Sequence, residues 1–321
     1  MRRHPCTVTS DWSVSGGGTM WHRSGDGEPA RGRRPRWPLL LGVGVVVALL
    51  GLTVVLLNRD SPAGHPCPAM SERPCVRLAV AGDTGTGDEQ QLRTVAAMQQ
   101  AQDGFAFDAL LLLGDLVYEV GDPERVDEAV LEPFAPLVDE GVNLVPVLGN
   151  HDVVSDGQDE ILRLLGESHN YYVEYVGSLR IIVLDSNEVD DDQTAWLRQV
   201  LGQSPPGVRW TIAAMHHPAY SAGEHGSDLE VREAWSPLFA EFDVPLVLAG
   251  HDHDYQRSDE IAGVTYVVSG GGAKLRATGS EDFTAVSESV LHFLDVAVYD
   301  DRLEVRAIGQ DGELVDQFTI R

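Results

Sequence analysis

The chain has 321 residues and carries 23 basic against 50 acidic side chains, a formal net charge of −27. Eight of the basic and three of the acidic residues precede residue 60, which leaves residues 60–321 with 15 basic and 47 acidic residues. So acidic a surface repels nucleic acid and anionic membrane faces and argues against both as electrostatic partners. The length accommodates one large domain or two small ones.

The N-terminal segments differ in composition from the rest of the chain. Residues 1–36 are rich in Gly, Ser, Pro and Arg and lack apolar periodicity, which predicts a disordered tail. An uncharged apolar run, Trp37–Leu57, follows. Its part from residue 39 to residue 57 is 19 residues long, enough in helical form to span roughly 30 Å of hydrocarbon. We therefore predict a single transmembrane signal anchor over residues 37–58.

The charges that flank this run predict its orientation. Four basic residues precede it closely, whereas only Arg59, beside Asp60, follows it; the four are Arg31, Arg33, Arg34 and Arg36. The positive-inside rule then leaves the tail in the cytoplasm and residues 60–321 outside the cell membrane. Cleavage near Ala63, which would release a secreted protein, remains an alternative.

A linker over residues 59–75 joins the anchor to the remainder of the chain and contains Cys67 and Cys75. On the extracytoplasmic side these two cysteines can form a disulfide that ties the linker to the first strand. The alternative is two unpaired thiols. Two thiolates alone are too few for a zinc site made only of cysteines.

Beyond the linker, apolar runs typical of buried strands end at short polar motifs. The runs are Val76–Ala81, Ala109–Leu113, Val142–Leu148, Trp210–Met215 and Pro245–Ala249. The motifs that follow them are Gly82-Asp83-Thr84-Gly85, Gly114-Asp115-Leu116-Val117-Tyr118, Gly149-Asn150-His151-Asp152, His216-His217-Pro218 and Gly250-His251-Asp252-His253. One such motif would be ordinary turn chemistry. Five in order predict a common site, because ligands of open α/β sheets collect at the carboxyl ends of the strands.

Helices and further strands alternate between these motifs. The expected helices are Asp88–Gln102, Glu124–Glu140, Glu160–Leu165, Gln193–Leu201 and Asp228–Glu241. The further strands are Tyr171–Val176, Arg180–Asp185, Val264–Ser269, Leu291–Val298 and Glu304–Ile308, the first two forming a hairpin across Gly177-Ser178. This pattern predicts one α/β (α+β) catalytic domain over residues 76–321. In it, two mixed β-sheets pack together between outer helices as a four-layer sandwich.

The polar residues of the motifs indicate a metal site. Two aspartates, an asparagine, a tyrosine and several histidines suit iron, manganese or zinc, and no thiolate is present to bind copper(I) or an iron–sulfur cluster. Asp115, in the second motif, is the natural bridge between two ions. Paired metals clamp the attacking and leaving oxygens of an in-line displacement and generate hydroxide from water. Helix capping by Asp83 and Asp115 is the simpler alternative, but it leaves Tyr118 and the histidines unexplained.

Taken together, the motifs resemble those of the calcineurin-like metallophosphoesterases, and within them the purple acid phosphatases, over roughly residues 76–275. The broad family usually opens with Asp-x-His, whereas this chain has Asp83-Thr84-Gly85. Purple acid phosphatases lack that histidine and carry a tyrosine three residues after the second aspartate, which is Tyr118 here. The stretch His216–His225 is similar to the small, single-domain, tartrate-resistant form of that subgroup, and Tyr266–Gly272 is similar to the closing strand and loop of the family.

The resemblance implies a role for each site residue. Asp83, Asp115, Tyr118 and His253 match the ligands of an iron(III) ion. The matches to the ligands of a second, divalent ion (iron, zinc or manganese) are Asp115, Asn150, His216 and His251. His151 and His225 match the catalytic histidines that contact the phosphate and its leaving group. We expect no metal bond from His217, and a surface histidine without a role is the alternative for His225, because its loop is rich in glycine.

The function that follows is hydrolysis of small phosphate monoesters by attack of a metal-bound hydroxide, as in acid phosphatases. A phosphodiesterase for cyclic-nucleotide or lipid-linked substrates is the alternative, because fold analogy does not separate the two activities. A non-catalytic metal- or phosphate-binding ectodomain is disfavoured, since every ligand position of the motifs is filled. The motifs specify no oligomeric state, and His292, in an alternating strand, is expected to be structural.

Overall fold

The computed structural model describes residues 73–102 and 104–321. The tail and anchor predicted for residues 1–58, and all of the linker before residue 73, lie outside these ranges. Among the helices in these two ranges, none has the length and apolar character needed to cross a membrane. Cys75 takes part in a disulfide bond, and its expected partner, Cys67, lies outside the described residues.

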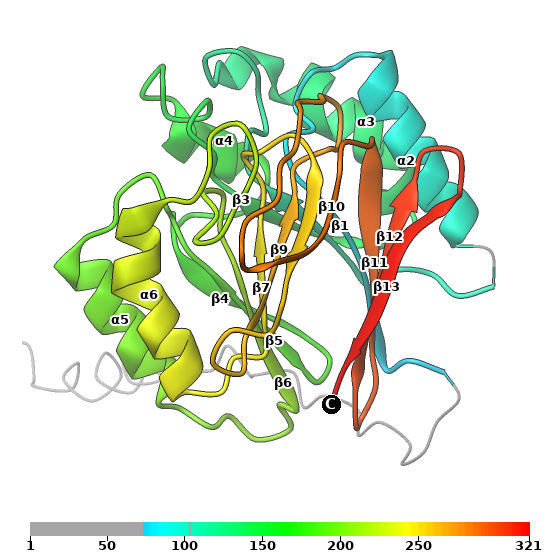
Figure 1. Ribbon diagram of the computed structural model, residues 1–321. Helices are drawn as coiled ribbons and strands as arrows, with labels where there is room; N and C mark the ends of the chain where they lie inside the picture. The colour runs from blue at the N-terminus through cyan, green and yellow to red at the C-terminus, as the bar shows by residue number, and fades with distance from the viewer. Residues whose placement is uncertain (1–72, 103) are drawn as a thin grey trace, which may run out of the picture. The chain divides into compact units, whose positions relative to one another are not determined.

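The described residues form two packed β-sheets with helices on their outer faces (Figure 1). The first sheet has the order β13-β12-β11-β1-β2-β3. Its parallel strands are β1 (Val76–Ala81), β2 (Ala109–Leu113) and β3 (Asn143–Val147). The antiparallel strands are β11 (His292–Val298), β12 (Leu303–Gly309) and β13 (Leu314–Ile320).

The second sheet has the order β10-β8-β9-β7-β6-β5-β4. Its parallel block consists of β5 (Leu179–Val183), β6 (Trp210–Ala214), β7 (Leu246–Ala249) and β9 (Thr265–Ser269). Strands β4 (Tyr172–Val176), β8 (Tyr255–Ser258) and β10 (Thr284–Glu288) pair antiparallel. The β4–β5 hairpin turns at Gly177 and Ser178 as predicted, with Gly177 at φ 56°.

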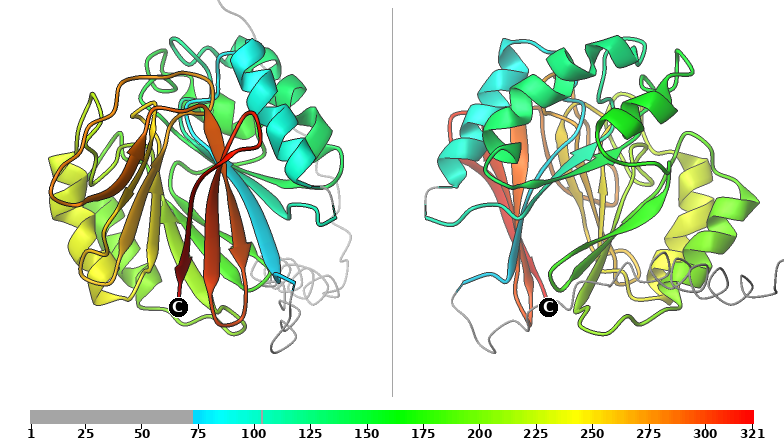
Figure 2. Two further views of the ribbon diagram at one scale, coloured as in Figure 1. Left: turned by 45° about the vertical axis from the view of Figure 1, so that its right-hand side comes forward. Right: turned by 180° about the vertical axis from the view of Figure 1, so that it is seen from behind.

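Apolar side chains fill the space between the sheets and the space beneath the helices. Leu111 and Val145 of the first sheet belong to the same buried cluster as Ile181 and Ile212 of the second. Figure 2 shows the outer layers: α2 (Glu89–Ala101), α3 (Glu132–Val138) and α4 (Gln158–Leu164) cover the first sheet, and α5 (Asp191–Leu201) and α6 (Leu229–Glu241) cover the second. The predicted architecture of two mixed sheets between helices is confirmed.

The helix predicted over residues 124–140 forms, but its hydrogen-bonding pattern changes along its length. Residues 123–125 form a 3₁₀ turn and residues 127–131 a π-helical turn, before α3 begins at Glu132. Pro133 has no N–H to donate to the carbonyl of Ala129, which an unbroken helix would require. The side chain of Gln91 replaces that donor, with Nε2 at 2.6 Å from the Ala129 oxygen.

Candidate active site

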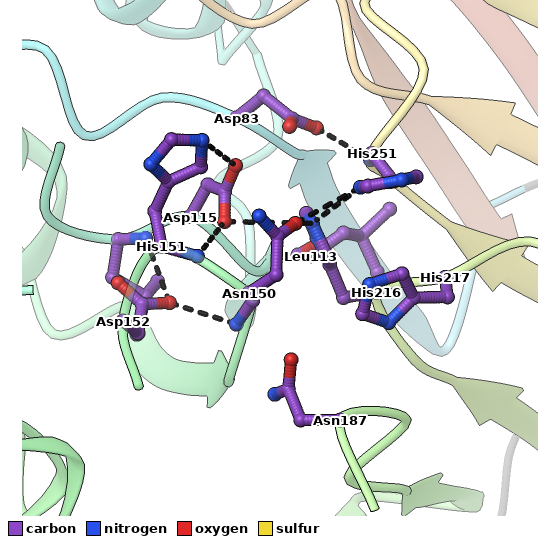
Figure 3. Close-up of polar contacts among 12 residues, drawn as sticks. Asp83, Leu113, Asp115, Asn150, His151, Asp152, Asn187, His216, His217 and His251 are labelled. Atoms are coloured by element: carbon purple, nitrogen blue, oxygen red, sulfur yellow. Dashed lines mark hydrogen bonds and ion pairs between the residues drawn. The ribbon is translucent and has the colours of Figure 1, made fainter. Parts of the chain in front are cut away.

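The five predicted motifs meet at one end of the two sheets (Figure 3). Asp83 and Asp115 follow β1 and β2, and His251 follows β7 of the other sheet. All three residues adopt positive φ angles, 59°, 52° and 71°. Backbone of this kind is uncommon outside glycine and concentrates at functional sites, where the surrounding structure holds it in place.

One group of side chains gathers around Tyr118. Its Oη lies 3.1 Å from Oδ1 of Asp83 and 3.2 Å from Nε2 of His253, and these last two atoms are 3.3 Å apart. All three residues are buried. They are the residues that the sequence predicts as iron(III) ligands, together with Asp115.

A second group gathers around Asn150. Its Oδ1 lies 3.0 Å from Nε2 of His216 and 3.0 Å from Nδ1 of His251. Asp115 connects the two groups: its Oδ1 is 3.4 Å from Nε2 of His216, and its carboxylate also hydrogen-bonds the Tyr118 hydroxyl. Asp83, Asp115 and His216 offer ligand atoms that all lie within 4.8 Å of one another.

The protonation of these groups fits a site for cations. Burial, reinforced by the neighbouring imidazoles, holds the pKa of His251 far below its usual range, and burial lowers that of His253 to about 4. Both imidazoles are therefore neutral at pH 7 and have a lone pair to offer a metal. Burial raises the pKa of the Asp83 carboxyl and, with the two carboxylates, that of the Tyr118 hydroxyl. A bound cation would offset this cost, so the donor set fits a binuclear metal centre.

His216 is oriented for metal binding by the end of β2. Its Nδ1 lies 2.8 Å from the carbonyl oxygen of Leu113, so Nδ1–H donates there and the Nε2 lone pair faces the site. This approach depends on Gly114, which has φ 90°, because a Cβ atom at that position would lie 2.4 Å from Nδ1 of His216.

The two predicted catalytic histidines lie at the edge of these groups and are more exposed. His151 has Nδ1 at 2.6 Å from the Glu119 carbonyl oxygen and Nε2 at 3.9 Å from Oδ2 of Asp115. His225 places its ring 4.4 Å from the ring of His251. The structure therefore brings both of them to the site, at positions open to a substrate.

His217, expected not to bind metal, has Nδ1 2.9 Å from Oγ of Ser186 and its ring 4.5 Å from that of His251. With His216 and His251 it forms a further group of side chains that could hold an ion. Burial lowers the pKa of His217 to about 4, so its imidazole is also neutral at pH 7. Its exclusion from the ligand set stays a prediction.

Sequence reasoning assigned no role to two buried aspartates that organise the site. Asp152 accepts the backbone N–H groups of Leu116, Val117 and Gly149 at 3.1, 2.9 and 2.8 Å, and so ties the loop after β2 to the loop after β3. Asp252 likewise accepts the backbone N–H groups of His225 and Gly226, in the segment that carries the predicted catalytic histidine. Their adjacency to His151 and His251 in the motifs was the signal available in the sequence.

Two cations also border the site. The ammonium group of Lys274, the only lysine of the chain, lies 3.4 Å from the centre of the Tyr118 ring and 2.9 Å from Oε1 of Glu119. Nε of Arg276 lies 3.3 Å from Nδ1 of His253. Although the domain is strongly acidic, these two positively charged side chains lie beside the site, where an anionic ligand would bind.

Known proteins with similar sequences include phosphoesterases and acid phosphatases. The family model described as calcineurin-like phosphoesterase matches residues 76–255. Tartrate-resistant acid phosphatase type 5 of Mus musculus is 25% identical over 267 residues, which cover 70% of this chain and 79% of the relative. Purple acid phosphatase 3 of Arabidopsis thaliana is 24% identical over 252 residues, 68% and 69% of the two chains. An uncharacterised protein of Mycobacterium tuberculosis is 31% identical over 111 residues, 29% of this chain and only 21% of that protein.

Solved structures show the same fold at lower identity. Purple acid phosphatase from seeds of yellow lupin (Lupinus luteus) superposes with a TM-score of 0.67 at 18% identity, covering 76% of this chain and 53% of that one. GAP50, the anchor in the inner membrane complex of Plasmodium, gives 0.65 at 15% identity, covering 77% and 88%. At these identities the similarity establishes the fold alone.

Proposed function

Because the chain belongs to the calcineurin-like phosphoesterase family and is a metal-dependent phosphoesterase, we propose that it is an acid phosphatase of the purple type. Its substrates would be small phosphate monoesters, hydrolysed at a binuclear centre. The observation that carries this proposal is the position of Tyr118, whose Oη lies within 3.2 Å of both Asp83 and His253. That is where a phenolate would have to lie to share an ion with them.

The residues proposed to hold the metals divide into two overlapping sets. Asp83, Asp115, Tyr118 and His253 would hold iron(III). A divalent iron, zinc or manganese ion would be held by Asp115, Asn150, His216 and His251. When bound, such a pair would supply positive charge that stabilises the phosphoryl oxygens and lowers the pKa of bound water. A trivalent ion would bring that pKa below the ~7 typical of zinc-bound water.

The reaction requires a proton for the leaving group and stabilisation of the phosphoryl group, and we assign these roles to the two histidines at the edge of the site. A water oxygen forms a new bond to phosphorus as the bond to the leaving-group oxygen breaks, and the departing oxygen takes up a proton, which gives an alcohol and inorganic phosphate. His225, beside His251, is positioned to supply that proton. His151 donates Nδ1–H to the Glu119 carbonyl, which fixes the ring with Nε2 toward Asp115, where it can contact the phosphoryl group.

Two substrates separate the proposed monoesterase from the phosphodiesterase alternative. The purified protein would be assayed side by side on p-nitrophenyl phosphate and bis-p-nitrophenyl phosphate between pH 4 and 8. We expect faster turnover of the monoester, with an optimum in the acidic part of this range. Faster turnover of the diester would replace the monoesterase by the phosphodiesterase.

Colour tests the role proposed for Tyr118. A phenolate bound to iron(III) absorbs visible light through charge transfer to the metal, so the protein is expected to be pink to violet. Tyr118→Phe removes the phenolate and should bleach this band, while Asp83 and His253 still hold the ion more weakly. Iron analysis and a visible spectrum of both proteins provide the measurement. A colourless, active enzyme that contains only manganese or zinc would contradict the purple subgroup while leaving the phosphoesterase intact.

We also propose that the catalytic domain faces the outside of the cell membrane. This rests on the sequence of the apolar run Trp37–Leu57 and on the arginines that precede it. Protease added to intact cells should degrade the catalytic domain and spare the tail. A catalytic domain that stays protected until the cells are lysed would contradict this orientation.

A further inference from the structure

His225 is presented by an irregular segment, residues 221–227, that precedes α6 and contains no helix or strand. The side chain is exposed, so packing does little to fix it. A group that transfers a proton must lie within hydrogen-bond reach of the reacting atom, and a displacement of about 1 Å can cost ~10²-fold in rate. Something other than regular secondary structure must therefore hold this segment in place.

The carboxylate of Asp252 holds it. Oδ1 accepts the backbone N–H of His225 at 2.8 Å, and Oδ2 accepts the N–H of Gly226 at 3.2 Å and the hydroxyl of Ser221. Asp252 is fully buried. Hydrogen bonds from N–H groups to a buried carboxylate are roughly twice as strong as bonds between neutral groups.

The segment wraps closely around this carboxylate. A Cβ atom at Gly223 would lie 2.4 Å from Cγ of Asp252, closer than real Cβ contacts come. Gln256 also holds the segment: its Oε1 accepts the N–H of Ala222 at 2.7 Å, and its Nε2 donates to Oγ of Ser221 at 2.9 Å. The carboxylate is thus the centre around which residues 221–227 fold.

Asp252 also lies between two of the proposed metal ligands in the sequence, His251 and His253. Its N–H donates to the carbonyl of Gly250 at 2.9 Å, and its carbonyl accepts the N–H of Asp254 at 2.7 Å, so the turn that aims both ligands also aims the carboxylate. We propose that Asp252 is a positioning residue that fixes His225 relative to the metal ligands. Through His225 it sets how well the enzyme cleaves esters whose leaving alcohol needs a proton. This inference rests on the proposed function of His225.

A second, exposed tether of the same segment provides a matched contrast. Oε1 of Glu224 pairs with Nη1 of Arg276 at 3.0 Å, and the two side chains are 58% and 33% exposed. Exposed ion pairs contribute little, because water screens them and both side chains lose conformational freedom. The buried carboxylate, not the exposed pair, should therefore control His225.

The test is Asp252→Asn in the full chain, assayed on two leaving groups. Asparagine keeps the shape but turns one acceptor into an N–H₂ donor that faces other donors. On ethyl phosphate, whose leaving oxygen must be protonated, we expect kcat to fall ~10- to 100-fold. On p-nitrophenyl phosphate, whose leaving group departs as a stable anion, we expect a fall of less than about threefold, because proton donation contributes little there. Glu224→Gln should change both rates by less than about twofold.

His225→Ala separates failure of this inference from failure of the proposed function. It should show the same selective loss on ethyl phosphate, and adding Asp252→Asn to it should cost little more, because the two changes remove one interaction. If His225→Ala spares ethyl phosphate, the proposed role of His225 fails, and the inference with it. If His225→Ala shows the loss but Asp252→Asn does not, or the two losses multiply, only the inference is overturned.

Metal content and folding complete the test. Asp252→Asn should retain the metal content of the natural protein; loss of metal, or equal losses on both substrates, would show that Asp252 supports the metal site rather than His225. If Asp252→Asn does not fold, Gly223→Ala reports on the same contact, since its added Cβ pushes the segment away from the carboxylate. It should produce the same selective loss on ethyl phosphate, and an unchanged ratio of the two rates would overturn the inference.

Discussion

The two sheets contribute chemically different halves of the site. The loops after β1, β2 and β3 supply oxygen donors, and the loops after β6 and β7 supply imidazoles. The oxygen half consists of Asp83, Asp115, Tyr118 and Asn150, and the imidazole half of His216, His251 and His253. Neither half holds a complete set of ligands for either proposed ion, so the site exists only when the sheets are packed together.

Burial acts on the two halves in opposite senses. It raises the pKa of the Asp83 carboxyl and that of the Tyr118 hydroxyl, so these two groups of the oxygen half hold their protons more tightly. It lowers the pKa of His253 to about 4 and holds that of His251 far below its usual range, which keeps these two imidazoles neutral down to acidic pH. A cation that binds Asp83 or Tyr118 must therefore displace a proton, and metal binding should weaken as the pH falls.

Contacts between the sheets hold the halves in register. Besides the shared apolar core, Oη of Tyr172 in β4 donates to the carbonyl of Pro146 in β3 at 2.7 Å. Oγ of Ser269, at the end of β9, lies 2.9 Å from Nε2 of His292 in β11. Both bonds join one sheet to the other, so substitutions at these residues can test how strongly the two halves of the site are held together.

The largest effect is expected from Asp115→Asn, because this carboxylate contacts both Tyr118 and His216 and so belongs to both proposed ligand sets. The amide cannot bridge two cations, so we expect loss of metal and no measurable turnover. Metal analysis and an assay on p-nitrophenyl phosphate provide the measurement. Asp295→Asn is the control: it removes a buried carboxylate of β11 that pairs with Arg77 at 2.8 Å, away from the site, and should retain metal and activity. Two retained ions with near-normal turnover in Asp115→Asn would refute the bridge.

A smaller effect is expected at the edge of the oxygen half. His151→Ala should lower kcat by ~10²–10³-fold with unchanged metal content, as when one group that stabilises transition-state charge is removed.

His217→Phe is the corresponding test on the imidazole half. Because His217 is expected not to be a ligand, the variant should keep both ions. Loss of metal in His151→Ala or in His217→Phe would show that the substituted histidine is a metal ligand, contrary to the proposal.

Much of this arrangement is predictable from the sequence because its signals are local. Each motif directly follows the apolar run that buries its strand, so the strand ends and the ligand positions come from neighbouring residues. The strands that the sequence did not predict are the polar β8, Tyr255–Ser258, and the partly buried β10 and β13, whose stability comes from pairing with neighbours. In each of these the apolar pattern that marks a buried strand is weak.

The two organising aspartates escaped prediction for a different reason. Asp152 binds the N–H of Leu116, 36 residues earlier, and Asp252 binds the N–H of His225, 27 residues earlier. Such contacts arise from tertiary packing, and no periodicity encodes them. The helix predicted over residues 124–140 forms, but it departs from regular α-helical bonding before Pro133, because proline cannot complete the hydrogen-bond ladder.

The smallest effect concerns the join between the sheets rather than the chemistry. His292 is fully buried; its Nδ1–H donates to the Val290 carbonyl at 2.9 Å, and its Nε2 accepts the Ser269 hydroxyl at 2.9 Å. This pairing satisfies the neutral ring only, and burial lowers the pKa of His292 to about 4. As the pH falls from about 6.5 to 4, the unfolded chain binds a proton that the folded protein does not, so the folded state loses stability.

His292→Gln tests this pH dependence. Glutamine does not titrate, so the variant should be less stable at pH 7 by about 1–2 kcal/mol, through its poorer hydrogen bonds, yet lose less stability between pH 7 and 4.5. Urea unfolding of both proteins at the two pH values, followed by tryptophan fluorescence, measures the difference. His169→Gln is the control, because the His169 side chain is 73% exposed and its loss should leave the natural pH dependence in place. A shallower decline in His292→Gln would show that protonation of His292, at the contact between the two sheets, limits stability in acid. An equal decline in all three proteins would show that His292 does not contribute to this loss.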